Sequence, residues 1–337
     1  MNFVTGATGL VGSYLCRYLI KKGEPVIALK RKTSKLDLLA DVATKINWIE
    51  GDLLDIDLLL EATKGCKRLY HCAALVSYQK KMHQQLIDVN ITGTKNIVNA
   101  ALFNNVTKIV HVSSIAALGT NIKQNLINEK QNADNWNSAY GLSKHLAELE
   151  IFRGIVEGID SVIINPSVIL GAGYWAKNSG KLFVQADNNF RYYSSGSTGY
   201  VDVRDVVSIM YQLMHTNVKN NRFIVSAQNL TFKNVLTDIA ILLNKKPPNI
   251  LAGSFLQNIA LTTDYFKSLF SKHERFLSRE LIKTAYTTKQ YDNTKIKTAL
   301  PVNFIPIKKS LNEIAIAYKQ SKAENTTFGI LPLVSNI

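Results

Sequence analysis

Thr5-Gly6-Ala7-Thr8-Gly9-Leu10-Val11-Gly12 follows the short apolar run Asn2–Thr5 and leads into a stretch with apolar residues at helical spacing. Glycine lacks Cβ, so it permits a tight turn, close approach of backbone N–H groups to a pyrophosphate, and close packing of helix on strand. The N-terminus of the following helix also favours negative charge. Strand, glycine turn and helix in this order predict a dinucleotide-binding turn rather than an ordinary tight turn of an unrelated α/β protein. The residues expected at the pyrophosphate are Gly6, Thr8, Gly9, Leu10 and Gly12.

Six short runs rich in Val, Ile and Leu alternate with longer amphipathic stretches. Strand followed by helix, repeated, is typical of right-handed crossovers that build a parallel sheet covered on both faces. We therefore expect an α/β protein with a doubly wound parallel sheet and a helix between successive strands. The expected strands are Asn2–Thr5, Val26–Lys30, Ile46–Ile49, Arg68–Cys72, Lys108–Ser113 and Ser161–Asn165.

The alternation of strand and helix breaks after Gly171, which predicts two lobes. Residues 1–170 are expected to form the dinucleotide-binding domain, to which elements near 200–226 return. Residues 171–322 are expected to form mainly a smaller substrate-binding lobe, and residues 323–337 a tail without a clear pattern. Aromatic residues of this lobe recur at helical spacing, and such residues more often form a core than line an apolar substrate pocket. They include Trp175, Phe183 and the stretch Phe255–Phe276.

Composition excludes several classes of protein. The chain has 337 residues, 46% of them apolar, and 40 Lys+Arg against 25 Asp+Glu give a formal charge of +15, so a large core is expected rather than disorder. No apolar stretch approaches the ~20 residues of a membrane-spanning helix, and no export signal opens the chain, so we expect a cytoplasmic protein. Cys16, Cys66 and Cys72 form no Cys-x-x-Cys pair, so no metal is expected. Solvated basic helix faces and anionic small molecules explain the charge better than nucleic acid does.

The second expected strand ends in the basic run Lys30–Lys35. An acidic residue there would bind the ribose 2′-hydroxyl of NAD, whereas cations suit a 2′-phosphate. We therefore expect NADP, with Arg31 as the bidentate ligand and Lys32 or Lys35 assisting. The alternative is that these side chains are merely exposed and that NAD is used. Asp52-Leu53, after the third strand, is expected at the adenine, with a carboxylate for the exocyclic amine and an apolar face for the ring.

Candidate catalytic residues lie at the start of a predicted helix that extends to Glu157. Tyr140 and Lys144 are four residues apart, so they project from one helix face. A tyrosine phenol titrates near ~10, and a nearby cation would favour its phenolate. Ser114 ends a strand at the edge where such sheets bind ligands, so it can hold a substrate oxygen, with Ser113 as a supporting hydroxyl. The alternatives are a chance pair on a helix surface and a serine that only forms a turn.

Together these motifs resemble the extended short-chain dehydrogenase/reductase family, also called NAD-dependent epimerase/dehydratase, whose dinucleotide-binding domain is a Rossmann fold. The resemblance covers residues 2 to about 320. The motifs occur in the family's order: Thr5–Gly12, Gly51-Asp52-Leu53, His71-Cys72-Ala73-Ala74, Asn90–Thr94, Ser113-Ser114, Tyr140-x-x-x-Lys144, Tyr200–Val206 and Tyr291–Lys295.

The resemblance implies a role for each matched residue. Tyr140 would donate or accept the proton, Lys144 would bind the nicotinamide ribose and lower the pKa of Tyr140, and Ser114 would hold the substrate oxygen. Asn90 would either steady its own helix, the role we favour, or join the catalytic group. The other cofactor contacts implied or expected are Ser113, Ala73, Ala74, Pro166, Ser167 and Val168, beside Tyr140 and Lys144.

Three departures separate the branches of the family. Ile115-Ala116-Ala117 stands where dehydratases carry an Asp-Glu pair, and Val168 stands where sugar-nucleotide epimerases carry an asparagine. The run Asn165–Gly171 resembles the dihydroflavonol 4-reductase-like branch, although that branch often has arginine at position 165, which puts a local salt bridge in doubt. This resemblance implies NADP(H)-dependent reduction of a carbonyl on a small organic substrate, or the reverse oxidation. The alternatives are a nucleotide-sugar epimerase with bound NAD and a non-catalytic NADP-sensing protein. Relatives in the family often form homodimers, so the resemblance also implies a homodimer.

Overall fold

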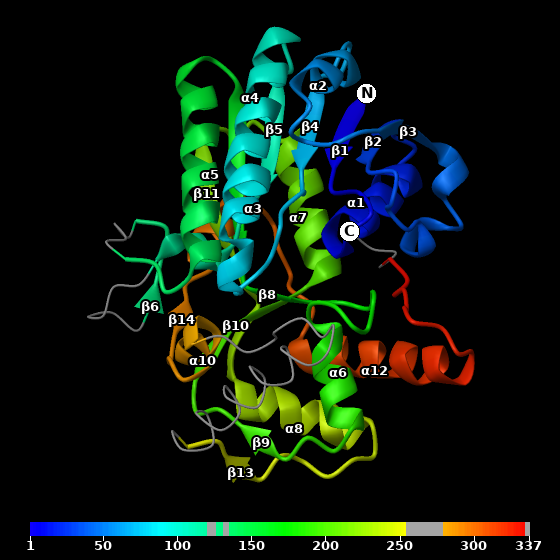
Figure 1. The fold of residues 1–337 in the computed structure, drawn as a ribbon, viewed down its shortest axis with the longest axis vertical. Coiled ribbons are helices and arrows are strands. Elements are labelled where there is room, and N and C mark those ends of the chain that lie inside the picture. Colours follow the sequence, from blue (N-terminus) through cyan, green and yellow to red (C-terminus); the bar gives the residue numbers. More distant parts are fainter. Residues whose placement is uncertain (120–125, 131–134, 254–278, 334–337) are drawn as a thin grey trace.

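A seven-stranded parallel sheet forms the centre of the computed structural model, which describes residues 1–119, 126–130, 135–253 and 279–333. The strand order is β3-β2-β1-β4-β5-β7-β11, and every neighbouring pair is parallel (Figure 1). The expected doubly wound sheet is therefore confirmed. Its strands are β1 (Asn2–Thr5), β2 (Val26–Lys30), β3 (Ile46–Glu50), β4 (Arg68–His71), β5 (Lys108–Val112), β7 (Asp160–Pro166) and β11 (Asn221–Val225).

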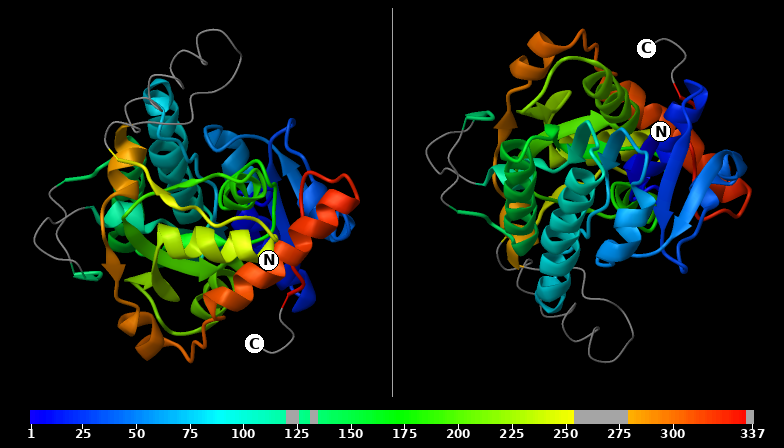
Figure 2. Two further views of the ribbon diagram at one scale, coloured as in Figure 1. Left: turned by 90° about the horizontal axis from the view of Figure 1, so that it is seen from below. Right: turned by 90° about the horizontal axis from the view of Figure 1, so that it is seen from above.

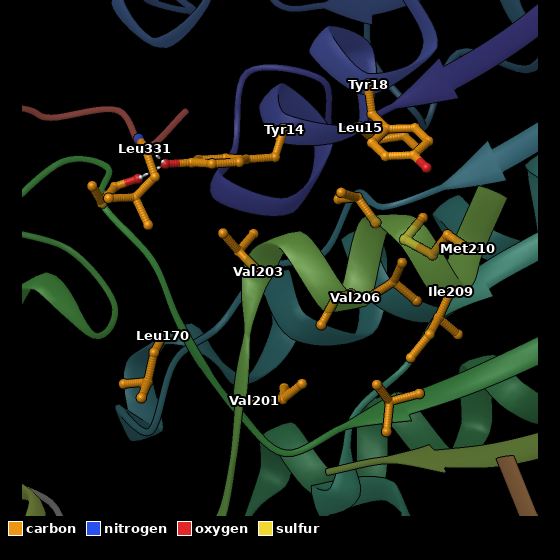
Figure 3. Packing of buried hydrophobic residues seen from close by; sticks show 14 of the residues in the cluster. Tyr14, Leu15, Tyr18, Leu170, Val201, Val203, Val206, Ile209, Met210 and Leu331 are labelled. Carbon is orange, nitrogen blue, oxygen red and sulfur yellow. Dashed lines mark hydrogen bonds between the residues drawn. The ribbon is translucent and has the colours of Figure 1, made fainter. Parts of the chain in front are cut away.

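Helices cover both faces of this sheet, and each face has its own apolar cluster. Helices α1 (Leu10–Lys21) and α7 (Val203–His215) pack on one face, where Leu15 lies among Val206, Ile209 and Met210 (Figure 3). The other face carries α4 and α5, which lie side by side in Figure 2, together with α2. These helices are α2 (Ile56–Ala62), α3 (His83–Leu86), α4 (Gly93–Phe103) and α5 (Ala139–Val156), with a π-turn at Ile87–Thr92 before α4.

The connection from β2 to β3 differs from the expected helix. It forms two short 3₁₀ turns, Asp37–Leu39 and Ala43–Lys45. Arg17 on α1 takes the carbonyl oxygen of Leu38 with its Nε at 3.0 Å and forms an ion pair with Asp41. The carbonyl of Leu38 therefore accepts its hydrogen bond from Arg17 on α1. A contact with a residue distant in sequence thus replaces the helix expected from the local pattern.

The second lobe lies beyond the carboxyl ends of the central strands (Figure 1). Strand β10 pairs in parallel with β8 and antiparallel with β12, and helix α8 packs between α6 and α12. The elements are β8 (Val168–Leu170), α6 (Gly180–Asp187), β9 (Tyr192–Tyr193), β10 (Ser197–Asp202), β12 (Gln228–Thr231), α8 (Phe232–Leu242), β13 (Ile250–Leu251), α10 (Arg279–Ala285), β14 (Gln290–Tyr291), α11 (Thr294–Ala299) and α12 (Ile307–Ala323), with β6 (Leu126–Ile127) beside β14. Trp175 and Phe183 pack with Tyr318 in the core, and Phe255–Phe276 lies outside the described residues.

Residues after α12 return to the first lobe. Gly329 donates its N–H to the carbonyl of Gly173 at 3.0 Å, and Leu331 donates its N–H to the Tyr14 hydroxyl at 2.7 Å. That hydroxyl donates to the carbonyl of Ala172 at 2.9 Å (Figure 3). The last described residues therefore fasten the segment after β8 against α1. Within the described ranges, no helix is both long and apolar enough to cross a bilayer.

The glycine turn predicts a specific sensitivity to added volume. A Cβ at Gly12 would lie 2.2 Å from the carbonyl oxygen of Gly6 and 2.8 Å from Cα of Ala7, and neither backbone atom can move aside easily. Gly12→Ala should lower the free energy of unfolding by about 1–3 kcal/mol, measured by urea denaturation. The control is Gly253→Ala, where no atom of the described residues lies within 4 Å of the added Cβ. Equal stability of the two variants would contradict the packing described for the turn.

Candidate active site

The glycine turn leaves an open helix N-terminus at the carboxyl edge of the sheet. Gly6 has φ +67°, and a Cβ there would lie 2.6 Å from the backbone nitrogen of Ala73. Gly9 donates its N–H to the carbonyl of Gly6 at 3.0 Å and caps α1 without any side-chain hydrogen bond. The turn lies on β1, beside β4, where the strand order reverses. Uncapped N–H groups at such a point suit the pyrophosphate of a dinucleotide.

The basic run at the end of β2 divides into one paired cation and three exposed ones. Lys30 forms an ion pair with Glu50 on β3 at 2.8 Å. Arg31, Lys32 and Lys35 are exposed, and none of them forms an ion pair within the described parts of the chain. Three unpaired cations at the same sheet edge suit a phosphate group on the adenosine ribose.

The residues expected at the adenine and along the cofactor differ in exposure. Asp52 is exposed, whereas Leu53 is buried in the cluster beneath α2 and α4, so it does not present the expected apolar face to a ligand. Ala73 donates its N–H to Thr5 Oγ1 at 3.3 Å and lies against the glycine turn, and Ala74 is exposed next to it. Asp52, Ala73 and Ala74 are therefore accessible or border the turn, and Leu53 is a core residue.

Close packing at the start of α5 brings Tyr140 to Ser114. Ser138 caps the helix, since its Oγ accepts the N–H of Gly141 at 3.0 Å. A Cβ at Gly141 would lie 2.8 Å from the carbonyl oxygen of Ala116, so only glycine lets the first turn of α5 pack directly on the 3₁₀ turn η5 (Ile115–Leu118). Across this contact the Ser114 hydroxyl lies close enough to Tyr140 to act on the pKa of its phenol.

Tyr140 is a buried phenol with a raised pKa. Its burial is the largest cause, and Tyr78, whose ring lies edge-on at 5.9 Å, adds to it. The nearby hydroxyl of Ser114 opposes the rise. The expectation that Lys144 lowers this pKa is not met, because the pKa of Tyr140 is raised and the Lys144 ammonium bonds elsewhere. Tyr140 is accordingly a protonated donor at neutral pH.

Lys144 lies one helical turn further along α5 and is only 1% exposed. Its Nζ donates to the carbonyl oxygen of Val112, at the end of β5, at 2.9 Å, and lies 3.5 Å from Nε2 of His111. Burial lowers the pKa of Lys144 to about 8, while Glu148 and then Cys72 raise it. The ammonium therefore sits at the end of β5 with low hydration.

Two buried histidines lie under the site, and the sequence-based prediction gives neither of them a role. His71 and His111 are register partners on β4 and β5, and their rings lie 5.0 Å apart. Burial lowers the pKa of His71 to about 3, and burial and Lys144 lower that of His111 far below its ordinary value. Both rings are thus neutral, so the ring of His111 can accept a hydrogen bond from Lys144. The signal available in the sequence is the pairing of two parallel strands that each carry one histidine.

Asn90 fastens the segment after β4. Its side chain accepts the N–H of Leu75 at 2.7 Å and donates to the carbonyl of Leu75 at 3.0 Å and to Ser143 Oγ at 2.9 Å. These side-chain contacts join the segment after β4 to α5 rather than to the helix in which Asn90 lies. Within the described residues, no cluster of three histidine, cysteine or acidic side chains is arranged to hold a metal ion.

The remaining expected residues flank the end of β5. Ser113 donates its hydroxyl to the buried carboxylate of Glu148. Pro166 ends β7 opposite Val225, and Val168 lies half-buried on β8. The structure thus brings Ser113, Ser114, Tyr140 and Lys144 together at one strand end, next to the end of β7.

Comparison with known proteins agrees with this geometry. Residues 2–226 match the model of the NAD dependent epimerase/dehydratase family. "Sterol demethylase protein B" of Methylococcus capsulatus is 31% identical over 274 residues, which cover 80% of this chain and 83% of that protein. A Synechocystis protein named "Putative dihydroflavonol 4-reductase" is 31% identical over 256 residues, 73% of each chain. The crystal structure of gox2253 has a TM-score of 0.81 at 27% identity, covering 95% of this chain and 98% of that one.

The family match at residues 2–226 includes the glycine turn, the end of β5 and the start of α5. The expected resemblance is confirmed, including its reductase-like relatives. The chain belongs to the NAD-dependent epimerase/dehydratase family of NAD(P)-dependent enzymes.

Proposed function

We propose that this protein is an NADP(H)-dependent oxidoreductase that reduces a carbonyl of a small organic substrate to an alcohol, or catalyses the reverse oxidation. The observation that carries the proposal is the packing of the first turn of α5 on the end of β5, which brings the Tyr140 phenol to Ser114 and the buried ammonium of Lys144 to Val112. A protonated phenol, a hydroxyl and a cation at the edge where such sheets bind nucleotides suit general acid catalysis.

Each residue has a distinct part in the proposed reduction. Bound NADPH supplies the hydride that reduces the carbonyl carbon. The hydroxyl of Ser114 holds the carbonyl oxygen, and Tyr140 Oη transfers its proton to that oxygen as negative charge develops there. The ammonium of Lys144, held at the carbonyl of Val112, would bind the nicotinamide ribose. The phenol of Tyr140 begins the reduction protonated, in keeping with its raised pKa.

NADP is the proposed cofactor because of the charges at the end of β2. Arg31 would take the 2′-phosphate with its guanidinium, with Lys32 or Lys35 assisting. The pyrophosphate would lie over the N-terminus of α1, where the backbone at Gly6 and Gly12 leaves no room for a Cβ. Pro166, Val168 and the two alanines after β4 would border the remainder of the cofactor.

Two alternatives have less support. A nucleotide-sugar epimerase would retain NAD, and Val168 lacks the amide expected in that branch. A non-catalytic NADP sensor would not need the buried Tyr140 and Lys144 pair. The reductase name of the Synechocystis relative favours reduction. A homodimer is also proposed, because α4 and α5 expose Phe103 (70%) and Val156 (88%).

Replacement of the proton donor tests the mechanism. Tyr140→Phe should lower kcat for carbonyl reduction by about 10²-fold to 10⁴-fold, because it removes the general acid. NADPH affinity, measured by fluorescence titration, should change little. The control is Tyr192→Phe, which removes a hydroxyl from an exposed tyrosine of the second lobe. Turnover of Tyr140→Phe at the rate of the unaltered protein would show that another group supplies the proton.

Replacement of Arg31 tests the cofactor assignment. The unaltered protein should be stabilised more by NADPH than by NADH in thermal-shift measurements, because binding to the folded state raises Tm. Arg31→Ala should weaken NADPH binding about tenfold, which corresponds to about 1.4 kcal/mol, and should leave NADH binding nearly unchanged. Lys64→Ala is the control, because that exposed cation pairs with Glu61 away from β2. A clear preference of the unaltered protein for NADH would refute the assignment.

A further inference from the structure

A fully buried carboxylate lies directly behind the proposed catalytic residues. Glu148 is 0% exposed and follows Lys144 by one turn of α5. Its Oε1 accepts from the hydroxyl of Ser113 and from Asn165 Nδ2 at 2.6 Å, and its Oε2 accepts from Arg222 Nη1 at 3.0 Å. A buried charge costs several kcal/mol unless it is paired and hydrogen-bonded, and here both oxygens have partners.

The network around Glu148 holds three consecutive residues at the end of β5. Lys144 binds the carbonyl of Val112, and Glu148 binds the hydroxyl of Ser113. Asn165 Nδ2 donates to the carbonyl of Ser114 at 2.9 Å while also donating to Glu148. The position of the catalytic hydroxyl therefore depends on how the Glu148 carboxylate is oriented.

Arg222 is the group that sets this orientation. It projects from β11, the edge strand beside β7, and within the described ranges it is the one cation paired with Glu148. Its other nitrogen, Nη2, donates to the carbonyl of Glu129 at 2.6 Å, and Glu129 Oε1 accepts the N–H of Ile224 at 2.8 Å. The guanidinium is thus fixed at both ends. Without it, Oε2 would be a buried anionic oxygen with no described partner, free to turn toward another donor.

We propose that Arg222 is a positioning residue for the reduction. By binding Oε2 it directs Oε1 to Ser113 and Asn165, and through them it fixes the backbone that carries Ser114. This role rests on the proposed function, because it acts through the catalytic residues named there. The resembled branch often has arginine at position 165, where this chain has asparagine. Here the guanidinium that binds Glu148 comes instead from Arg222 on the neighbouring strand.

The chain offers a matched rescue. Asn165 on β7 and Arg222 on β11 both bind the carboxylate of Glu148. The two strands are adjacent, and Arg222 lies two residues from Ile224, the register partner of Asn165. An arginine at 165 can therefore place its guanidinium on Glu148 when position 222 is apolar. The three variants are Arg222→Met, Arg222→Lys and the double variant Asn165→Arg/Arg222→Met. Arg153→Met is the control, because Arg153 lies on α5 but pairs with Glu150 and Glu157 at the surface.

The first measurement is steady-state reduction of a carbonyl substrate with NADPH. Arg222→Met should lower kcat about tenfold to 100-fold, because small displacements of a catalytic group cost this much. KM for the carbonyl and for NADPH should stay within about twofold, and the double variant should recover at least part of kcat. Arg222→Lys should show a smaller loss of kcat, because its ammonium still pairs with Glu148. Some loss should remain, because one ammonium does not reproduce the two-sided contact of the guanidinium with Glu148 and the carbonyl of Glu129. The Arg153 variant should retain full activity.

The second measurement does not depend on turnover. Hydrogen exchange followed by mass spectrometry should show faster exchange in residues 112–119 of the Arg222 variants, with α1 unchanged. Unaltered kcat and unaltered exchange in Arg222→Met would refute the role, as would a loss confined to KM. If Arg222→Met does not fold, the same two outcomes in Arg222→Lys decide. If the unaltered protein reduces no carbonyl, the proposed function fails, and exchange in 112–119 alone supports or refutes the positioning.

Discussion

The docking of helix α5 on the carboxyl end of strand β5 determines the geometry of the site. The ammonium of Lys144 bonds to the carbonyl of Val112 at 2.9 Å, and Gly141 lets the first helical turn reach the backbone at Ala116. Tyr140 lies on the same helix face, so one packed interface places Tyr140 at Ser114 and Lys144 at Val112. The loss of hydration around the ammonium lowers its pKa, and Glu148 offsets part of that cost.

The sequence alone predicts the elements whose causes are local. Strands β1 and β2 have the expected bounds, Asn2–Thr5 and Val26–Lys30, because each is a continuous apolar run bounded by turn residues. The glycine turn follows from the need to omit Cβ atoms, and α5 ends at Val156, next to the expected end at Glu157. The meeting of Ser114 with Tyr140 was predictable only because parallel strands end at one edge of the sheet.

Other features depend on contacts between distant residues, which no local pattern contains. The crossover between β2 and β3 forms 3₁₀ turns because Arg17 takes a carbonyl of that segment. Leu53 matches a cofactor motif but is covered by α4, and Arg222 meets Glu148 only when β11 joins the sheet beside β7. The raised pKa of Tyr140 likewise follows from its burial and from Tyr78. These properties follow from strand register and burial, which appear only in the folded chain.

The most direct measurement of this account is the pKa of Lys144 itself. Protein labelled with ¹³C at lysine Cε can be titrated by NMR, with the Lys144 signal assigned by its loss in Lys144→Met. Burial of Lys144 beside His111 and Val112 predicts a titration midpoint of about 8, well below the ordinary lysine pKa of about 10.4. A midpoint at the ordinary lysine value would mean that the ammonium is hydrated, and that α5 does not hold it against the end of β5.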